Sequence, residues 1–399
     1  MNIFNAEVIS EFFRNHYFFF LTSIFLGTFI STWYIIPKII WVTNEKQLTK
    51  PVIDRSVHVK PIPTFGGVAF FMTMILTLSL VQALRLSYVG NHLIAAITIL
   101  FMVGLKDDLV VSTARVKLVG QFLAIAFLVF SPELGISSLN GFLGITEIPS
   151  IVGYGLAGFV LLAIVNSYNL IDGIDGLAAV AGIIIGVIYS VVFYFSGEHF
   201  YVLLSMTLVG MLSGFLRFNF SKGSRKIFMG DSGALVIGLL IGFLTLRFLS
   251  LEGSLGIQGF PSENRLLFVL AVLFIPFFDT TRSILIRLLN KKSPFEPDRN
   301  HTHHVLLDAG CTHMQASLLL GLLNSVVVAA ILILSTSFGS WVLSGILLGI
   351  FGLCCWGFDL LKKAYPPKEI PKGIKIGQVT LKSKAQNSQI KKEKVDLAG

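Results

Sequence analysis

The sequence has few charged residues and few cysteines. Asp, Glu, Lys and Arg make up 13% of its 399 residues, whereas hydrophobic residues make up 54% and mean hydropathy is +0.79. A soluble domain of this length could not cover so much apolar surface, so the composition excludes a soluble globular protein. The cysteines, Cys311, Cys354 and Cys355, fit neither a disulfide framework nor the ligand spacing of a zinc site.

The N-terminal segment lacks the features of a cleaved signal peptide. It carries Glu7, Glu11 and Arg14, and no small-residue cleavage site precedes the first apolar run. We therefore expect that run to stay in the protein as a membrane span.

Long apolar runs are abundant. About 20 apolar residues cross a bilayer as a helix. Eleven runs approach that length: 17–42, 65–84, 92–105, 118–130, 151–169, 176–195, 200–216, 233–250, 265–289, 315–335 and 340–361. The sequence predicts an all-α polytopic membrane protein with about eleven transmembrane helices.

Lys and Arg are distributed unevenly between the two sides of these runs. With the N-terminus outside, the inner segments hold 25 of the 31 basic residues, and the outer loops 131–150, 196–199, 251–264 and 336–339 hold none. Because cytoplasmic loops are enriched in Lys and Arg, we predict an N-out, C-in topology. This topology accounts for the net charge of +9, so we infer no nucleic-acid partner.

We predict one membrane domain, residues 1–361, and a basic cytoplasmic tail, 362–399. The tail composition is typical of a disordered, solvated extension that anionic membrane lipids attract. In the outer loop 131–150, Asn140-Gly141 beside short β-prone stretches predicts a small periplasmic hairpin.

Two acids and an amide lie between two apolar runs, in the segment Asn169-Leu170-Ile171-Asp172-Gly173-Ile174-Asp175-Gly176. An acid at the centre of a membrane helix costs about 2.5–3.5 kcal/mol on insertion scales, whereas an acid at a wet helix end costs far less and can bind a cation. An EF-hand loop is excluded because Ile183 stands where its last acidic ligand belongs. A turn with solvated acids is the alternative.

A second acidic pair, Asp107 and Asp108, follows the run 92–105. Adjacent like charges repel unless a cation shares them, so the pair is either a Mg²⁺ ligand or base, or a helix-end pair bound to nearby Lys and Arg. The candidate basic partners are Lys106, Arg115 and Lys117.

Two further acids border apolar runs. Asp231 precedes the run 233–250, where it is a helix N-cap, part of a phosphate–metal site at a helix N-terminus, or both. Asp279 lies in the run 265–289, three residues before Arg282, so it is either functional or part of a structural ion pair.

Histidines and basic residues gather in the inner loops. The segment Asp298-Arg299-Asn300-His301-Thr302-His303-His304 lacks the further Cys or His that a transition-metal site needs, which favours donors for a diphosphate. The first inner loop, with Lys50, is either an ordinary basic loop or one that steers an anionic substrate. The predicted topology puts all these clusters on one side.

Four motifs carry a family resemblance: Lys106-Asp107-Asp108-Leu109, the segment from Asn169 to Ala178, Phe228-Met229-Gly230-Asp231-Ser232-Gly233, and the segment from Pro294 to His304. With them the chain resembles the polyprenyl-phosphate N-acetylhexosamine-1-phosphate transferases, which begin bacterial envelope glycans. Because Thr302 interrupts the histidines, the chain is most similar to the branch that uses UDP-N-acetylglucosamine.

The resemblance implies transfer of an N-acetylhexosamine 1-phosphate from a UDP-sugar to undecaprenyl phosphate, with release of UMP, and it favours N-acetylglucosamine as the sugar of this chain. This would be the first membrane step of O-antigen, common-antigen or teichoic-acid synthesis. It implies Mg²⁺ as cofactor, with Mn²⁺ as a substitute. It also implies a bacterial inner-membrane location with a cytoplasmic active site, and leaves room for a homodimer.

The resemblance also implies residue roles. Asp107 or Asp108 would be the base or the nucleophile, and Asp231, with Asp108 nearby, would hold the metal. Asn169, Asp172 and Asp175 would hold the nucleotide sugar and its metal, with Asp172 and Asp175 counted among the catalytic residues. The diphosphate would be bound by Arg299, His301, His303 and His304, with Lys50 among the substrate-binding residues.

Two alternatives stay open. One is transfer of phospho-N-acetylmuramoyl-pentapeptide, although that branch carries three consecutive histidines. The other is an ion-coupled transporter, which would place acids near the bilayer midplane between discontinuous helices.

Overall fold

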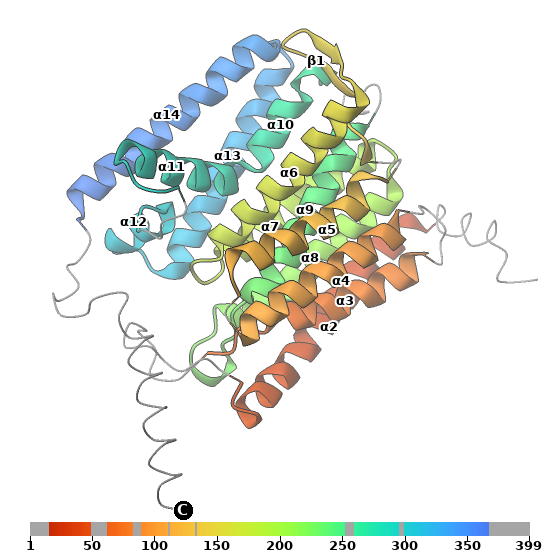
Figure 1. Ribbon diagram of the computed structural model, residues 1–399, viewed down its shortest axis with the longest axis vertical. Helices are drawn as coiled ribbons and strands as arrows, with labels where there is room; N and C mark the ends of the chain where they lie inside the picture. Colours follow the sequence, from red (N-terminus) through yellow and green to blue (C-terminus); the bar gives the residue numbers. More distant parts are fainter. Residues whose placement is uncertain are drawn as a thin grey trace, which may run out of the picture.

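The computed structural model describes residues 16–48, 62–82, 89–110, 112–131, 134–251, 259–294 and 299–366. These residues form a bundle of α-helices with one small sheet (Figure 1). The helices are α2 (Tyr17–Glu45), α3 (Gly66–Gln82), α4 (Gly90–Leu109), α5 (Ala114–Val129), α6 (Ser150–Ile171), α7 (Leu177–Phe195), α8 (His199–Asn219), α9 (Gly230–Ser250), α10 (Arg265–Val272), α11 (Phe274–Leu289), α12 (Thr302–Asp308), α13 (His313–Ser335) and α14 (Ser340–Ala364). Two short 3₁₀ helices are η2 (Gly223–Arg225) and η3 (Ser262–Asn264).

The predicted polytopic, all-α architecture is confirmed. Seven of the described helices are long and apolar enough to cross a membrane, or eight if α10 and α11 form one broken span. The shorter helices α3 and α5, of 17 and 16 residues, coincide with predicted runs without reaching that length. The count of eleven spans and their orientation stay predictions.

Helix α9 occupies the centre of the bundle. Its most apolar window is 94% buried, whereas that of the peripheral helix α14 is 11% buried. Glycines let α3 and α4 approach the first turn of α9 to backbone contact. A Cβ on Gly67 would lie 2.2 Å from the nitrogen of Gly233, and one on Gly104 would lie 2.4 Å from the Cα of Ser232. Small residues at such contacts are typical of packed membrane helices.

The predicted span 265–289 is wrong in one respect, because it consists of two helices bent by 70°. Pro276 has no N–H to continue the helical hydrogen bonds. In a straight helix its ring would clash with the carbonyl of Val272, four residues earlier. The side chain of Asn324 on α13 bonds to both ends of the break: its Nδ2 donates to the oxygen of Val272 (3.1 Å) and its Oδ1 accepts from the nitrogen of Ile275 (3.0 Å). The bend turns α11 away from the line of α10.

The predicted hairpin is present, with its turn shifted. Strand β1 (Ser138–Phe142) pairs antiparallel with β2 (Ile145–Glu147). The turn lies at Leu143 and Gly144, whose φ angles of 50° and 86° suit a tight hairpin turn. The Asn140-Gly141 pair, also at positive φ, instead lies inside β1, where the strand register shifts.

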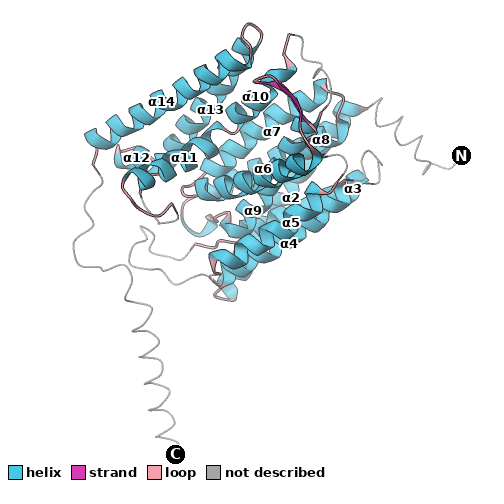
Figure 2. Cartoon of the chain, turned by 45° about the horizontal axis from the view of Figure 1, so that its top comes forward, coloured by secondary structure: helices cyan, strands magenta, loops and turns pink. Residues whose placement is uncertain are grey.

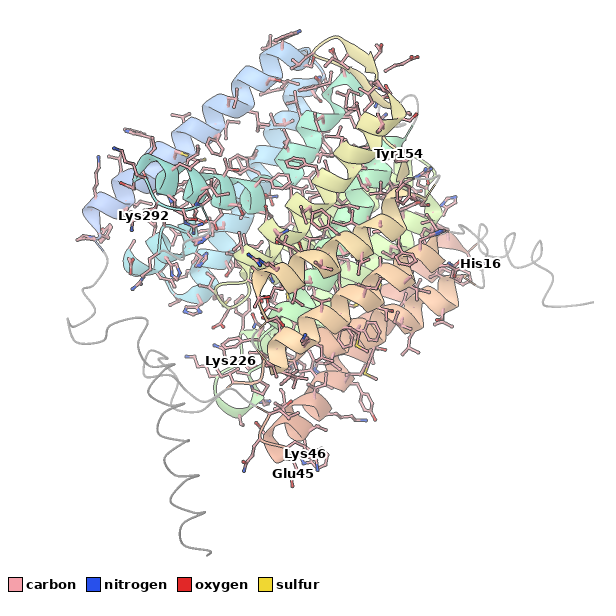
Figure 3. All side chains as sticks on the ribbon, in the orientation of Figure 1. His16, Glu45, Lys46, Tyr154, Lys226 and Lys292 are labelled. Carbon is pink, nitrogen blue, oxygen red and sulfur yellow. The ribbon has the colours of Figure 1, made fainter. Side chains whose placement is uncertain are left out.

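The two ends of the bundle differ. The hairpin lies at one end and α12 at the other (Figure 2). Lys46 and Lys226 lie far from Tyr154, which is at the hairpin end (Figure 3). We call the end with α12 and η2 the basic end. The predicted tail begins inside α14, which continues to Ala364, and residues 367–399 lie outside the described part.

Candidate active site

Asp108, from the last turn of α4, holds the N-terminus of α9. Its Oδ1 accepts a hydrogen bond from the nitrogen of Asp231 (2.9 Å), and its Oδ2 accepts from the nitrogen (3.0 Å) and hydroxyl (2.6 Å) of Ser232. The first N–H groups of a helix have no partner within the helix, so a carboxylate there stabilises both the helix and its own charge. Asp108 is 2% exposed and is fully used as a cap.

Because Asp108 is the cap, Asp231 is released from that role. The Asp231 side chain makes no capping bond to α9 and is 27% exposed. Its Oδ1 instead accepts hydrogen bonds from the Nζ of Lys117 (3.0 Å) and the Nδ2 of Asn169 (3.1 Å). The start of α9 is therefore capped by the carboxylate of Asp108 on α4, and Asp231 faces polar groups from two other helices.

Lys117 joins the acids of two motifs. Its Nζ lies 2.9 Å from Oδ2 of Asp107 and 3.0 Å from Oδ1 of Asp231. Asp107 also accepts from the nitrogen of Ser112 (2.6 Å) and is 5% exposed. A single ammonium thus neutralises two carboxylates that would otherwise repel each other.

The segment 169–176 contributes two acids in different electrostatic settings. Within the described residues, the half-buried Asp172 carboxylate accepts no hydrogen bond. Burial raises its pKa well above the usual range, and the negative charges of Asp231, Asp108 and Asp175 raise it further. Asp172 is therefore a carboxyl group placed where a cation would favour its ionised form.

Asp175 has two basic partners. Its Oδ2 lies 2.5 Å from the Nζ of Lys226 and 3.0 Å from the Nδ1 of His313. Burial alone would raise the pKa of Asp175, but the hydrogen bonds from His313 and Lys226 lower it below its ordinary value. Asp175 ties the start of α7 to the loop after η2 and to α13.

The histidine segment is built around Asp279 of α11, which is 1% exposed. Its Oδ1 accepts from the nitrogen (2.6 Å) and hydroxyl (2.7 Å) of Thr302, and its Oδ2 lies 2.6 Å from the Nδ1 of His301. The expected pairing of Asp279 with Arg282 is absent from the described ion pairs. Arg282 instead donates to the oxygen of Asn300 and to Asp359 (both 2.6 Å).

The acidic and histidine segments meet at Gly173. A Cβ on Gly173 would lie 2.5 Å from the Nε2 of His303, so the imidazole lies against the backbone of the acidic segment. Within the described residues, the buried Nδ1 of His303 has no hydrogen-bond partner. Burial lowers the pKa of His303 to about 3, and burial also lowers that of His304, with the nearby charge of Arg299 adding to the effect.

Other predicted site residues are not brought together in this way. Arg299 is 46% exposed and pairs with Asp308 (3.2 Å) on α12. Lys50 and Asp298 lie outside the described residues. Among the residues that are described, no group of three His, Cys, Asp or Glu side chains is poised to bind a metal ion.

Three basic residues that contact the acids carry weak signals in the sequence: Lys117, Lys226 and His313. Lys117 counted only as one of three ion-pair partners, although its place one residue before an apolar run put it at the same membrane level as the acids. Lys226 counted only as part of a basic loop. His313 had no signal, because a lone histidine before a helix is common.

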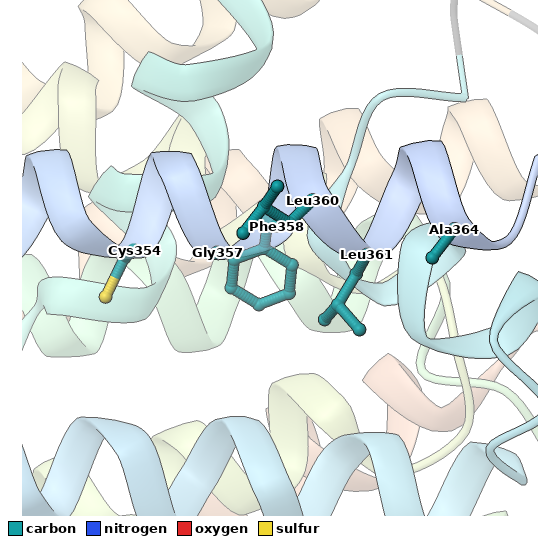
Figure 4. Close-up of a pocket in the computed structure, with 6 residues that line it drawn as sticks. All are labelled: Cys354, Gly357, Phe358, Leu360, Leu361 and Ala364. Atoms are coloured by element: carbon teal, nitrogen blue, oxygen red, sulfur yellow. The ribbon is translucent and has the colours of Figure 1, made fainter.

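An apolar groove lies on α14 (Figure 4). It is open, has a volume of about 510 Å³ and is lined by Cys354, Gly357, Phe358, Leu360, Leu361 and Ala364. None of these side chains is charged, so the groove contributes no group for phosphate chemistry.

The chain is similar in sequence to known proteins. The decaprenyl-phosphate N-acetylglucosaminephosphotransferase of Mycolicibacterium smegmatis is 32% identical over 292 residues, which cover 67% of this chain and 70% of that protein. The model of glycosyl transferase family 4 matches residues 91–249. The chain belongs to this family.

Further relatives in glycosyl transferase family 4 have related names. The probable undecaprenyl-phosphate N-acetylglucosaminyl 1-phosphate transferase of Bacillus subtilis is 31% identical over 290 residues, covering 71% of this chain and 76% of that protein. The undecaprenyl-phosphate alpha-N-acetylglucosaminyl 1-phosphate transferase of Escherichia coli is 28% identical over 271 residues, covering 67% and 71%. The matched family region runs from α4 through α9 and contains all the acids that surround the α9 N-terminus.

Proposed function

We propose that the protein transfers N-acetylglucosamine 1-phosphate from its UDP-sugar to undecaprenyl phosphate and releases UMP. The relatives named above act on polyprenyl phosphates and on this sugar phosphate. The observation that carries the proposal is the convergence of Asp108, Lys117 and Asn169 on residues 231–232 at the start of α9. Carboxylates, a lysine and a helix N-terminus in one place suit a metal-bound diphosphate.

Mg²⁺, with Mn²⁺ as a substitute, is the proposed cofactor. Magnesium is bound through one or two carboxylates and completes its shell with water and substrate phosphates. Asp231 and Asp172 fit this pattern, since neither carboxylate accepts a hydrogen bond from the N-terminus of α9 among the described residues, and the charge of Asp231 bears directly on Asp172. Bound there, the metal would neutralise charge that develops on the diphosphate as UMP leaves. Asp108 supports the metal site by fixing the turn that carries Asp231.

The proposed reaction is a direct displacement at phosphorus. An oxygen of the lipid phosphate attacks the sugar-bearing phosphorus of the donor, a P–O bond forms, and the P–O bond to UMP breaks with its electrons on UMP. We assign to Asp107 the role of accepting a proton from the lipid phosphate. Asp108 is a poor nucleophile because both of its oxygens accept hydrogen bonds from α9.

The remaining polar residues are assigned to the donor. Asn169 and Asp175 line the segment proposed to hold the nucleotide sugar, with Lys226 beside Asp175. His303, His304 and Arg299 are the proposed donors to the diphosphate, because Arg and His supply N–H groups that match phosphate oxygens.

We propose an N-out, C-in protein with about eleven crossings of a bacterial inner membrane. The basic end of the bundle would then face the cytoplasm, where a water-soluble UDP-sugar is available. The product would enter an envelope glycan such as O antigen, common antigen or teichoic acid.

Release of UMP by purified protein tests the proposal. We expect release from UDP-N-acetylglucosamine and undecaprenyl phosphate in the presence of Mg²⁺, and none when either substrate is omitted. UDP-N-acetylmuramoyl-pentapeptide and UDP-N-acetylgalactosamine serve as competing donors. Preference for the pentapeptide donor would overturn the assignment, and so would an absence of UMP from every donor.

A further inference from the structure

The three histidines of the segment 301–304 differ in how their ring nitrogens are used. Both nitrogens of His301 lie against other side chains: Nδ1 is 2.6 Å from Oδ2 of Asp279 and 3.3 Å from Oγ of Ser283, and Nε2 is 3.3 Å from Nη2 of Arg287. His303, in contrast, has a buried Nδ1 without a partner among the described residues. Both ring nitrogens of His301 are thus used by protein groups, whereas Nδ1 of His303 is not, among the described residues.

The contacts of His301 assign its tautomer. A guanidinium has only donors, so Nε2 of His301 accepts from Arg287 and carries no proton. The ring proton is therefore on Nδ1, where it is donated to the Asp279 carboxylate. With Nε2 accepting and Nδ1 donating to protein groups, His301 has no N–H left to offer to a diphosphate.

The three residues connect two elements. Asp279 and Arg287 lie on α11, two turns apart, and both are buried. Arg287 also donates to the oxygen of Pro294 (2.7 Å) at the start of the following loop, and Asp279 also caps α12 through Thr302. His301 is thus fixed at both ends of its ring by one helix at the point where the next begins.

The rings of His303 and His304 lie beside that of His301. The planes of His301 and His303 are nearly parallel, at 17°, with centroids 5.6 Å apart, and His303 and His304 are 4.4 Å apart. His303 is held on its other side by the backbone of Gly173.

We propose that His301 is a positioning residue, held in one tautomer between Asp279 and Arg287, whose ring places His303 and His304 at the donor diphosphate. Only one part of this proposal rests on the proposed function, namely that the donor diphosphate binds at His303 and His304. The three residues of the clamp, Asp279, His301 and Arg287, do not touch substrate.

Two amide substitutions separate this role from direct diphosphate binding. The amide nitrogen of Asn occupies the place of a histidine Nδ1, and that of Gln reaches the place of Nε2. Because the proposal needs the Nδ1 donor, His301→Asn should keep kcat within about 10-fold of the original protein, while His301→Gln should lose about 100-fold, the usual cost of a 1 Å misplacement near reacting atoms. The KM for the UDP-sugar should change little in the Asn variant.

The opposite order, with Gln the more active and Asn raising the KM for the donor, would overturn the proposal in favour of direct binding through Nε2. Thermal unfolding of both variants in detergent controls for folding. If the unsubstituted protein releases no UMP from any donor, the proposed function fails instead, and the tautomer remains testable without activity.

Nitrogen-15 NMR of protein labelled at histidine provides that second test on the unsubstituted chain. The His301 signals are assigned by their loss in His301→Asn. We expect a protonated Nδ1 and an unprotonated Nε2. A proton on Nε2 would overturn the clamp whether or not the protein is an active transferase.

Discussion

Helices α9 and α12 both begin at the basic end of the bundle, and each is capped by a carboxylate from another helix. Asp108 of α4 binds the nitrogen and hydroxyl of Ser232, and Asp279 of α11 binds the nitrogen and hydroxyl of Thr302. The difference lies in the adjacent side chain. Asp231, next to Ser232, is partly exposed. His301, next to Thr302, is instead enclosed by Asp279 and Arg287.

The same capping arrangement therefore has different consequences at α9 and at α12. At α9 the cap supplied by α4 leaves the Asp231 carboxylate without a capping bond, as the proposed metal site requires. At α12 the cap supplied by α11 also binds an imidazole, that of His301, as the proposed clamp requires. Four substitutions, in order of expected effect, test this contrast.

The largest effect is expected at the freed carboxylate. Asp231→Asn should lower UMP release about 10³-fold or more, because charge stabilisation by a bound metal is worth several kcal/mol. The thermal midpoint should change little, since Asp231 is not the cap of α9. Glu198→Gln, whose ion pair with Arg247 belongs to the other end of α7 and α9, is the matched control. Full activity in Asp231→Asn would remove the metal assignment.

Substitution of the cap itself should affect folding. In Asp108→Asn, an amide NH₂ faces N–H and O–H donors of α9, and leaving buried donors unpaired costs about 1–3 kcal/mol. We expect a lower thermal midpoint in detergent together with lower activity. Asp308→Asn removes a partly exposed ion pair and should cost under about 1 kcal/mol. Equal midpoints for the two variants would show that Asp108 is not the cap.

The contact between Gly173 and His303 should not accommodate even one added methyl group. Gly173→Ala puts a Cβ where the Nε2 of His303 now lies, so the ring must move. We expect about a 10-fold loss of UMP release, within the range that small displacements near the chemistry produce. The control is Gly155→Ala in α6, the helix that precedes Gly173. A Cβ at Gly155 would have nothing within 4 Å, so this substitution should leave the rate unchanged. Equal rates for both variants would mean that His303 need not be held at Gly173.

The smallest effect is a change in the pH dependence of stability. The pKa of His303 is about 3 in the folded protein, against an ordinary value of 6.5. Between these values the unfolded chain binds the proton and the folded chain does not, so stability is lost as the pH falls from about 6.5 toward 3. In His303→Gln the thermal midpoint should therefore fall less between pH 7 and pH 5 than in the original protein. An identical fall would show that this imidazole is not buried in its neutral form.

The helices and the gathering of the motifs could be predicted because both follow from apolar runs. Asp108, Asn169 and Asp231 each border such a run, so their convergence at one membrane level is set by helix length. Of the roles left open for Asp231, the capping of α9 belongs instead to Asp108, because only the packing of α4 on α9 brings that acid there. Close approach through Gly67 and Gly104 has no local signal of its own.

The histidine segment was harder to predict for the same reason. The pairing of Asp279 with Arg282 satisfied helical spacing, yet the bend at Pro276 and the helix α12 give each residue a distant partner. Helical periodicity describes neighbours within one helix, whereas these contacts depend on where a broken helix turns.

The break between α10 and α11 also has a consequence for biosynthesis. At the break, the carbonyl of Val272 and the N–H of Ile275 are bonded by the side chain of Asn324, which lies 49 residues downstream of Ile275. Until α13 has entered the membrane beside it, that backbone lacks its partner in a medium where an unsatisfied group costs several kcal/mol. We therefore expect helix α11 to reach its final direction only after α13 has been inserted, and the histidine bound to Asp279 to be placed late.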